Sequence, residues 1–151
     1  MAFTTDSYVS VEEAEDYFAT RLNSMPWDES TEVDKLKALI TATRLIDTLN
    51  LKGYKYSSLQ ALEFPRYGQS DIPEDVKIAC CEIAIQLLDG ADVNMEVENI
   101  AAQRLEYANL RNHSDRSFTL DHLRAGIPSV EAWHKLLPYI IDPSVVTIRR
   151  N

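Results

Sequence analysis

The chain is poor in the residues on which several classes of functional site depend. Its four glycines do not fall at the spacing of a phosphate-binding loop, so nucleotide binding of that kind is not expected. The two cysteines, Cys80 and Cys81, are adjacent, and no Cys-x-x-Cys or His-Glu-x-x-His pattern occurs, so we expect buried free thiols and no zinc site. No apolar run approaches the roughly eighteen residues of a membrane span.

Basic residues are also scarce relative to acidic ones. The chain has 15 Lys and Arg against 24 Asp and Glu, a formal net charge of -9. Such a surface repels polyanions unless a basic patch overcomes it locally, which argues against a domain that grips phosphate backbones. With 151 residues, 45% hydrophobic and 26% charged, the composition is that of one folded domain with a core.

No group of residues has the pattern of an active site. The run His113-Ser114-Asp115 contains a base, a nucleophile and an acid, but adjacent residues in a turn rarely converge as a catalytic triad requires. The abundant carboxylates collect where helices begin and compensate the helix dipole there. We therefore expect no enzyme, no cofactor and no metal.

Two amphipathic helices are predicted in the first third of the chain. The first follows Ser10, which with Glu13 has the pattern of a capping box. Its expected apolar stripe is Val11, Ala14, Phe18 and Leu22. The second starts near Ser30 or Thr31 and ends around Asn50. Its expected stripe is Val33, Leu36, Leu39 or Ile40, Thr43, Ile46 and Leu49.

Two further helices are predicted. One opens with Pro73 at its first position, is apolar almost all round, as a central helix would be, and ends at Asp89-Gly90. A short last helix follows Ser129 and stops before Pro138. By their pattern alone, residues 93–118 fit either a helix or a small β-hairpin. The expected fold is mainly α: a bundle of about four helices with a long loop, an extended C-terminal tail and a small hairpin as one option, divided into a helical domain 1–138 and a tail 139–151.

The long connection 51–71 is the candidate interaction site, since loops of this length are usually functional. Leu59, Leu62 and Phe64 are expected to pin its middle to the body. The candidate interface residues are Tyr54, Tyr56, Phe64, Pro65, Arg66 and Tyr67. They could stack on bases and attract phosphates of single-stranded DNA. Alternatively, Phe64 anchors the loop, Arg66 bridges to a helix carboxylate, and the tyrosines form a protein interface. The net charge favours the second interpretation.

Four segments together resemble a known family. They are YVSVEEAEDYF (8–18), KALITATRLID (37–47), Leu62-Glu63-Phe64-Pro65-Arg66 and IPEDVKIA (72–79). They are similar to the head-tail connector, or adaptor, proteins of tailed bacteriophages, some of which carry the label DnaT-like single-strand-DNA-binding protein. The resemblance covers roughly residues 7–90, and the C-terminal Leu136-Leu137-Pro138-Tyr139 also fits it. Many relatives have Trp in place of Phe64, and residues 91–127 depart most from the family.

The resemblance implies a helical bundle with a long loop and often a small β-hairpin, which favours the hairpin for residues 93–118. It also implies a structural virion protein at the head-tail junction, made in the host cytoplasm. In the family, copies assemble as a ring, commonly a dodecamer, beneath the portal protein. The ring extends the channel through which packaged DNA passes without specific binding, and it presents a surface to the next tail or neck protein; no membrane is involved. The C-terminal tail tends to insert into the portal. Carried over to this chain, the docking residues are Ile140, Ile141, Val145, Val146, Ile148, Arg149 and Arg150.

Two other functions stay open at this point. One is a single-stranded-DNA-binding module that uses residues 54–67. The other is a helical enzyme or regulatory domain, which no motif in the sequence supports.

Overall fold

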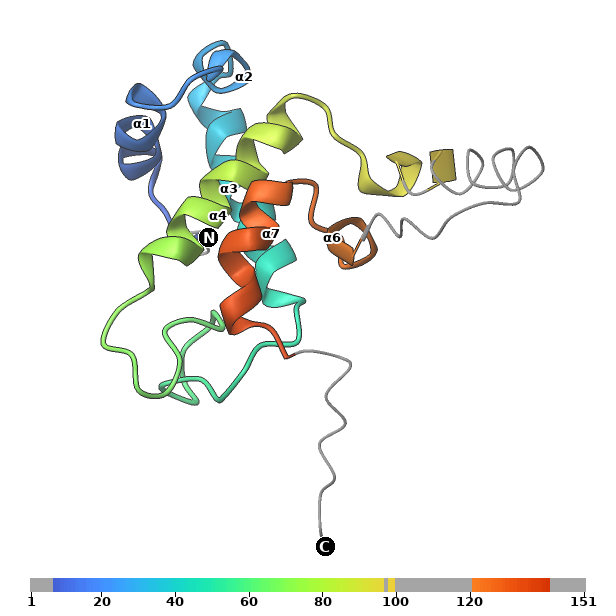
Figure 1. Ribbon diagram of the computed structural model, residues 1–151. Helices are drawn as coiled ribbons and strands as arrows, with labels where there is room; N and C mark the ends of the chain where they lie inside the picture. The colour runs from blue at the N-terminus through green and yellow to red at the C-terminus, as the bar shows by residue number, and fades with distance from the viewer. Residues whose placement is uncertain (1–6, 97, 100–120, 142–151) are drawn as a thin grey trace, which may run out of the picture.

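The computed structural model describes residues 7–96, 98–99 and 121–141. In these residues the elements are helices joined by loops, without strands, so the expected mainly α class is confirmed (Figure 1). None of the helices in the described part combines the length and apolar character needed to cross a bilayer.

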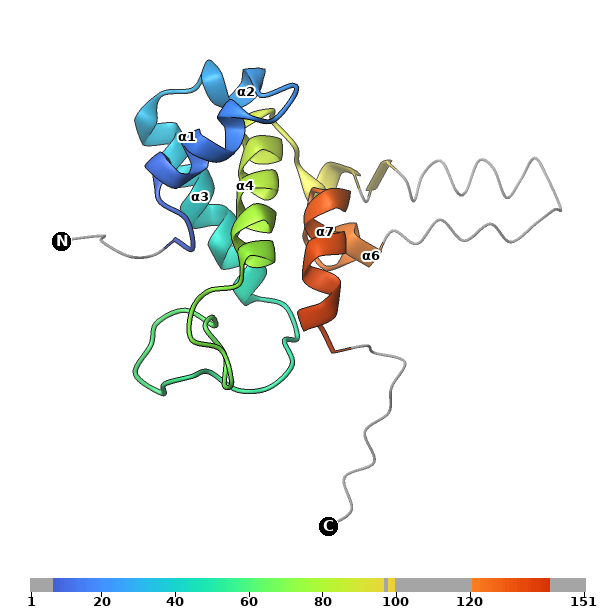
Figure 2. The ribbon, with the colours of Figure 1, turned by 60° about the vertical axis from the view of Figure 1, so that its left-hand side comes forward.

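The core is built around α4 (Glu74–Leu88). This helix lies between α3 (Glu32–Asp47) and α7 (Val130–Leu136), as Figure 2 shows, and it also contacts α1 and α2. The predicted central position of this apolar helix is confirmed, although Pro73 occupies the N-cap rather than the first helical position. Cys80 and Cys81 are free and buried, as expected. Burial raises the pKa of Cys80 to about 11 and also raises that of Cys81.

The start of α1 (Val11–Ala19) is as predicted, but its end is not. Ser10 and Glu13 form the capping box, with Ser10 Oγ accepting from Glu13 N at 3.1 Å and Glu13 Oε2 accepting from Ser10 N at 2.9 Å. The helix stops at Ala19, so Leu22 lies in the following turn and is 85% exposed rather than part of the core stripe. The short α2 (Met25–Asp28), which we did not predict, fills that side of the core with the buried Trp27.

An ion pair joins Arg21, two residues after α1 ends, to the buried Glu82 of α4. Glu82 is almost fully buried, and its two carboxylate oxygens accept from Arg21 Nε at 2.7 Å and Arg21 Nη2 at 2.9 Å. Tyr17 Oη donates to the same carboxylate at 2.6 Å. Burial and this hydrogen bond raise the pKa of Tyr17. The pair compensates a charge on α4 that the core would otherwise leave unsatisfied.

Helix α3 starts where the sequence predicted, but its buried face is rotated. Thr31 caps it by accepting from Asp34 N at 3.2 Å. The buried residues are Lys35, Ala38, Leu39, Ala42, Thr43 and Ile46. The expected core positions Val33 and Leu36 are exposed, so that part of the prediction is wrong. The buried face includes Lys35, Ala38 and Ala42, which a stripe of large apolar residues does not predict.

The last helix and the chain after it differ from the prediction in one respect. Ser129 caps α7, and α7 ends at Leu136, before Pro138, both as expected; the 3-10 helix η1 (Leu137–Tyr139) follows it directly. Lys52 N then donates to Tyr139 O and Ile141 N to Asn50 O, both at 2.8 Å. Residues 139–141, which we assigned to the tail from the sequence, therefore pair with the start of the long loop.

Residues 91–127 are described only in part. Residues 93–96 are helical, and a short α6 (Asp121–Arg124), which we did not predict, precedes Gly126. Residues 100–120, which include most of the predicted hairpin, lie outside the described residues, as do the tail residues 142–151.

Candidate functional site

The long loop folds back on itself as a short antiparallel pairing. Tyr67 N donates to Tyr54 O at 2.7 Å, and Tyr56 N donates to Pro65 O at 3.1 Å. Between these two hydrogen bonds, Lys55 and Arg66 form an isolated antiparallel bridge. The two candidate segments, 54–56 and 65–67, are thus brought side by side.

This pairing sorts the candidate residues onto two faces. Side chains alternate along paired extended chains, and directly opposed residues share a face. Tyr54, Tyr56 and Tyr67 therefore share one face, where their exposures are 80%, 64% and 82%. We call these three residues the tyrosine face. Lys55 and Arg66 lie on the opposite face.

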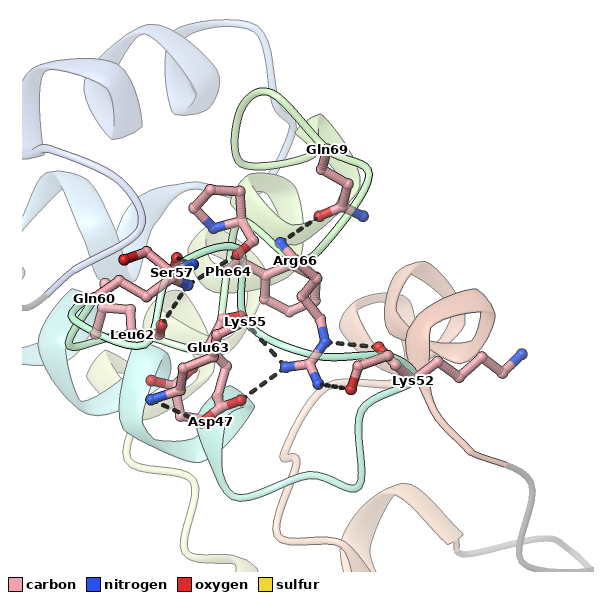
Figure 3. A network of polar contacts seen from close by, with 12 residues as sticks. Asp47, Lys52, Lys55, Ser57, Gln60, Leu62, Glu63, Phe64, Arg66 and Gln69 are labelled. Carbon is pink, nitrogen blue, oxygen red and sulfur yellow. Dashed lines mark hydrogen bonds and ion pairs between the residues drawn. The ribbon is translucent and has the colours of Figure 1, made fainter. Parts of the chain in front are cut away.

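Three of the five charged side chains of the loop, those of Lys55, Glu63 and Arg66, pair with one another on the face opposite to the tyrosine face. Arg66 is buried and pairs through Nη1 with Glu63 Oε2 at 2.7 Å, while its Nε and Nη2 donate to Lys52 O at 2.6 Å and Gly53 O at 2.5 Å (Figure 3). Lys55 Nζ lies 3.4 Å from Glu63 Oε1. The expected bridge from Arg66 to a helix carboxylate is therefore wrong, because its carboxylate partner is in the loop itself.

Phe64 anchors the loop to the body, as predicted. Its buried ring packs edge-on against Tyr8, with centroids 5.8 Å apart, and against Tyr139 at 5.6 Å. Phe64 N donates to Tyr8 Oη at 3.2 Å, and Tyr8 Oη donates to the Asp47 carboxylate. Burial and the hydrogen bond to Asp47 raise the pKa of Tyr8. Sequence reasoning missed Tyr8 as a loop support, because its partners lie far away in the chain.

The side-chain amides of Gln60 and Gln69 make further hydrogen bonds to the backbone of the loop. Gln60 Nε2 donates to Leu62 O at 2.8 Å and to Pro65 O at 2.9 Å, and Gln69 Oε1 accepts from Arg66 N at 2.9 Å (Figure 3). Leu59, which we expected to pin the loop, is instead almost fully exposed. Leu62, in contrast, packs against the core as expected. The loop is thus held by Phe64, by Leu62 and by polar contacts along its inner side.

The charge of the loop differs from that of the whole chain. Residues 51–71 contain three basic and two acidic residues, so their net charge is +1 against -9 for the chain. Two of the three cations, however, pair with Glu63 on the inner face. The tyrosine face therefore offers aromatic surface with little attraction for phosphate.

A hollow of about 320 Å³ lies between α1 and α4, away from the long loop. Its lining includes Glu13, Tyr17, Lys77 and Cys81. Glu13 pairs with Lys77 at 2.9 Å, and its pKa is lowered by the Ser10 N–H and by Lys77. The raised pKa of Cys81 keeps its thiol protonated, so the hollow holds no activated nucleophile. Within the described residues, no group of three or more His, Cys, Asp or Glu side chains is arranged to hold a metal ion.

A protein-family model described as "Putative DnaT-like ssDNA binding protein" matches residues 2–122. This chain belongs to that family. Searches of curated proteins and of solved structures found no match. The part that matches the DnaT-like family includes the whole long loop with its tyrosine face, and ends before α7. The family description is the label that the sequence resemblance led us to expect for some relatives of phage adaptors.

Proposed function

We propose that this DnaT-like protein is a non-enzymatic structural component of a phage neck. It forms a ring beneath the portal, extends the DNA channel and joins the capsid to the tail. The observation that carries the proposal is the tyrosine face, which is exposed on a loop held in place by the buried Phe64 and by the hydrogen bonds of Arg66. Tyrosine is enriched at protein interfaces, and a pre-organised surface loses little conformational entropy when it binds. The pairing of both Lys55 and Arg66 with Glu63 leaves these cations less free for a phosphate backbone, which suits a protein partner better.

The portal is the proposed partner of the C-terminal tail. Ile140 is half-buried and packs on its own chain, and the backbone N–H of Ile141 donates to Asn50 O. We therefore place the docking segment in Val145, Val146, Ile148, Arg149 and Arg150. Burial of the three aliphatic side chains would contribute about 5 to 9 kcal/mol before the cost of ordering the tail. An extended apolar segment can add to a sheet edge or groove of its partner.

Mixing with purified portal rings tests this proposal. We expect the full chain to bind the rings and a chain lacking residues 142–151 not to bind them. This truncation spares Ile140 and Ile141, so the truncated chain should melt at the same temperature as the full chain. This comparison of melting temperatures is the folding control. Equal binding of the two forms would show that the tail is not the docking element.

Binding of single-stranded DNA is the second candidate function. The family description and the three exposed aromatic rings favour it, since stacking of a base on an aromatic ring contributes about 1 to 3 kcal/mol. Fluorescence anisotropy with a labelled oligonucleotide at about 0.1 M salt separates the two functions. Sub-micromolar binding that weakens steeply with salt and is lost in Tyr54→Ala/Tyr67→Ala would favour DNA binding. The adaptor proposal expects no such affinity.

A further inference from the structure

The hollow between α1 and α4 takes no part in the proposed function. It has a volume of about 320 Å³ and lies where the two helices run beside each other (Figure 2). Pockets for small molecules have volumes of about 300 to 1,000 Å³, so the hollow has room for one small ligand or one long side chain. The chemistry of its lining indicates which ligand fits.

Part of the lining is apolar and fixed in place. Val9 and Cys81 are buried, and Ile78 is half-buried. Tyr17 adds an aromatic ring, which is held by the hydrogen bond from its hydroxyl to Glu82 at 2.6 Å. The Cys81 thiol is 2% exposed and makes no hydrogen bond to another described residue, so one buried polar group of the lining is left without a partner.

The rest of the lining carries an excess of negative charge. It contains the carboxylates of Glu13, Asp16 and Glu74 and one ammonium group, that of Lys77, which gives a net charge of -2. Glu13 pairs with Lys77 at 2.9 Å. Asp16 and Glu74 are exposed and form no ion pair within the described part of the chain. Asp71, also exposed, lies near Lys77 and adds to the negative charge. The hollow therefore attracts a cation.

The cation that suits this lining is a guanidinium group. Within the described residues, no three His, Cys, Asp or Glu side chains are placed to hold a metal ion, and Asp16 and Glu74 lie on different helices. A guanidinium is planar and has five N–H donors, so it can pair with two carboxylates at once, whereas an ammonium is a compact and more strongly hydrated charge. A guanidinium also stacks on an aromatic ring such as that of Tyr17.

We infer that the hollow binds a guanidinium group at the end of an aliphatic stem, and that an arginine of a partner protein supplies it. Asp16 and Glu74 accept from the N–H groups, and the stem lies against Val9 and Ile78. A free molecule of this size has few other contacts to offset the freedom it loses on binding, whereas an arginine of a protein brings the contacts of the surface around it. Arginine is also enriched at protein interfaces. The hollow belongs to the single chain, so the inference does not depend on the proposed ring.

A titration of the full chain, followed by its backbone amide signals in NMR spectra, tests the site. N-acetylarginine methylamide represents the arginine of a partner and should shift the signals of Tyr17, Lys77 and Cys81 with a Kd of about 1 mM. N-acetyllysine methylamide has the same charge and should bind about tenfold more weakly.

Variants connect the binding to the two carboxylates. Asp16→Asn/Glu74→Gln should abolish the shifts. Glu12→Gln/Glu32→Gln is the matched control, because it removes two exposed carboxylates outside the lining and should leave the Kd unchanged. Asp16→Asn alone leaves α4 unaltered and should raise the Kd about tenfold. Thermal melting of each variant, expected to be unchanged at these exposed positions, excludes unfolding as the cause.

The inference is wrong if no signal at the hollow shifts, if the lysine probe binds as tightly as the arginine probe, or if Asp16→Asn/Glu74→Gln binds like its control. Agmatine, a free guanidinium compound, should bind no more tightly than N-acetylarginine methylamide. Tighter binding of agmatine would show that a free small molecule is the ligand and would overturn the assignment to a partner protein. Portal binding is measured separately, so a chain that binds portal rings but not the arginine probe would contradict only this inference.

Discussion

Truncation of the buried loop anchor, Phe64→Ala, should strongly destabilise the protein. The Phe64 ring is 2% exposed and lies between Tyr8 and Tyr139, which come from the N-terminal segment and η1. Removing a buried phenylalanine typically costs about 3 to 5 kcal/mol, including the cavity left behind. Because the whole free energy of unfolding of a domain is about 5 to 15 kcal/mol, this loss is a large fraction of it.

Thermal or urea unfolding followed by circular dichroism measures this loss. For a domain of this size, 1 kcal/mol corresponds to about 2 to 4 °C, so we expect a fall in Tm of about 6 to 20 °C. Leu59→Ala is the matched control, since Leu59 is in the same loop but 94% exposed, and it should change the stability by less than about 0.5 kcal/mol. If Phe64→Ala and Leu59→Ala had the same Tm, the loop would not be anchored through Phe64.

Three further predictions concern the ionisable groups. Glu82→Gln removes the negative charge that pairs with the half-buried Arg21 and should lower the free energy of unfolding, measured by urea titration, by about 2 to 3 kcal/mol. Glu12→Gln, at an exposed site, should leave the free energy of unfolding unchanged in the same titration. The pKa of Tyr8 is raised in the folded state, so the stability that its hydroxyl contributes is complete below the unfolded pKa of 10.0 and is lost as the pH rises above that value. The difference in the free energy of unfolding between the natural chain and Tyr8→Phe should therefore shrink by up to about 1.4 kcal/mol per pH unit above pH 10.0. A difference that stays constant would contradict the assignment. The buried Cys80 and Cys81 should react with a thiol reagent at about pH 8 only after urea unfolds the chain, and rapid labelling of the native protein would show that they are accessible.

Local chemistry made the helix starts predictable. The Ser10–Glu13 capping box and the caps at Thr31 and Ser129 depend on residues within one turn, so the sequence alone identifies them. The orientation of α3 was less predictable, because it depends on which neighbours cover the helix. Apolar spacing includes Val33 as readily as any buried position, yet no part of the described chain covers it.

The candidate site was predictable in its residues but not in its arrangement. The sequence identified Phe64 as an anchor and placed the tyrosines on one loop. It could not assign Arg66 to Glu63, because the choice among many carboxylates depends on how the loop folds back. Nor could it show that Lys55 turns away from the tyrosines, since that follows from the pairing of residues 54–56 with 65–67.

Electron microscopy of portal rings mixed with the full chain tests the central claim most directly. The adaptor account predicts an additional ring of density at the tail-facing end of the portal, and its loss when residues 142–151 are removed. Portal rings that look the same with and without the protein, together with sub-micromolar binding of the protein to single-stranded oligonucleotides, would contradict it.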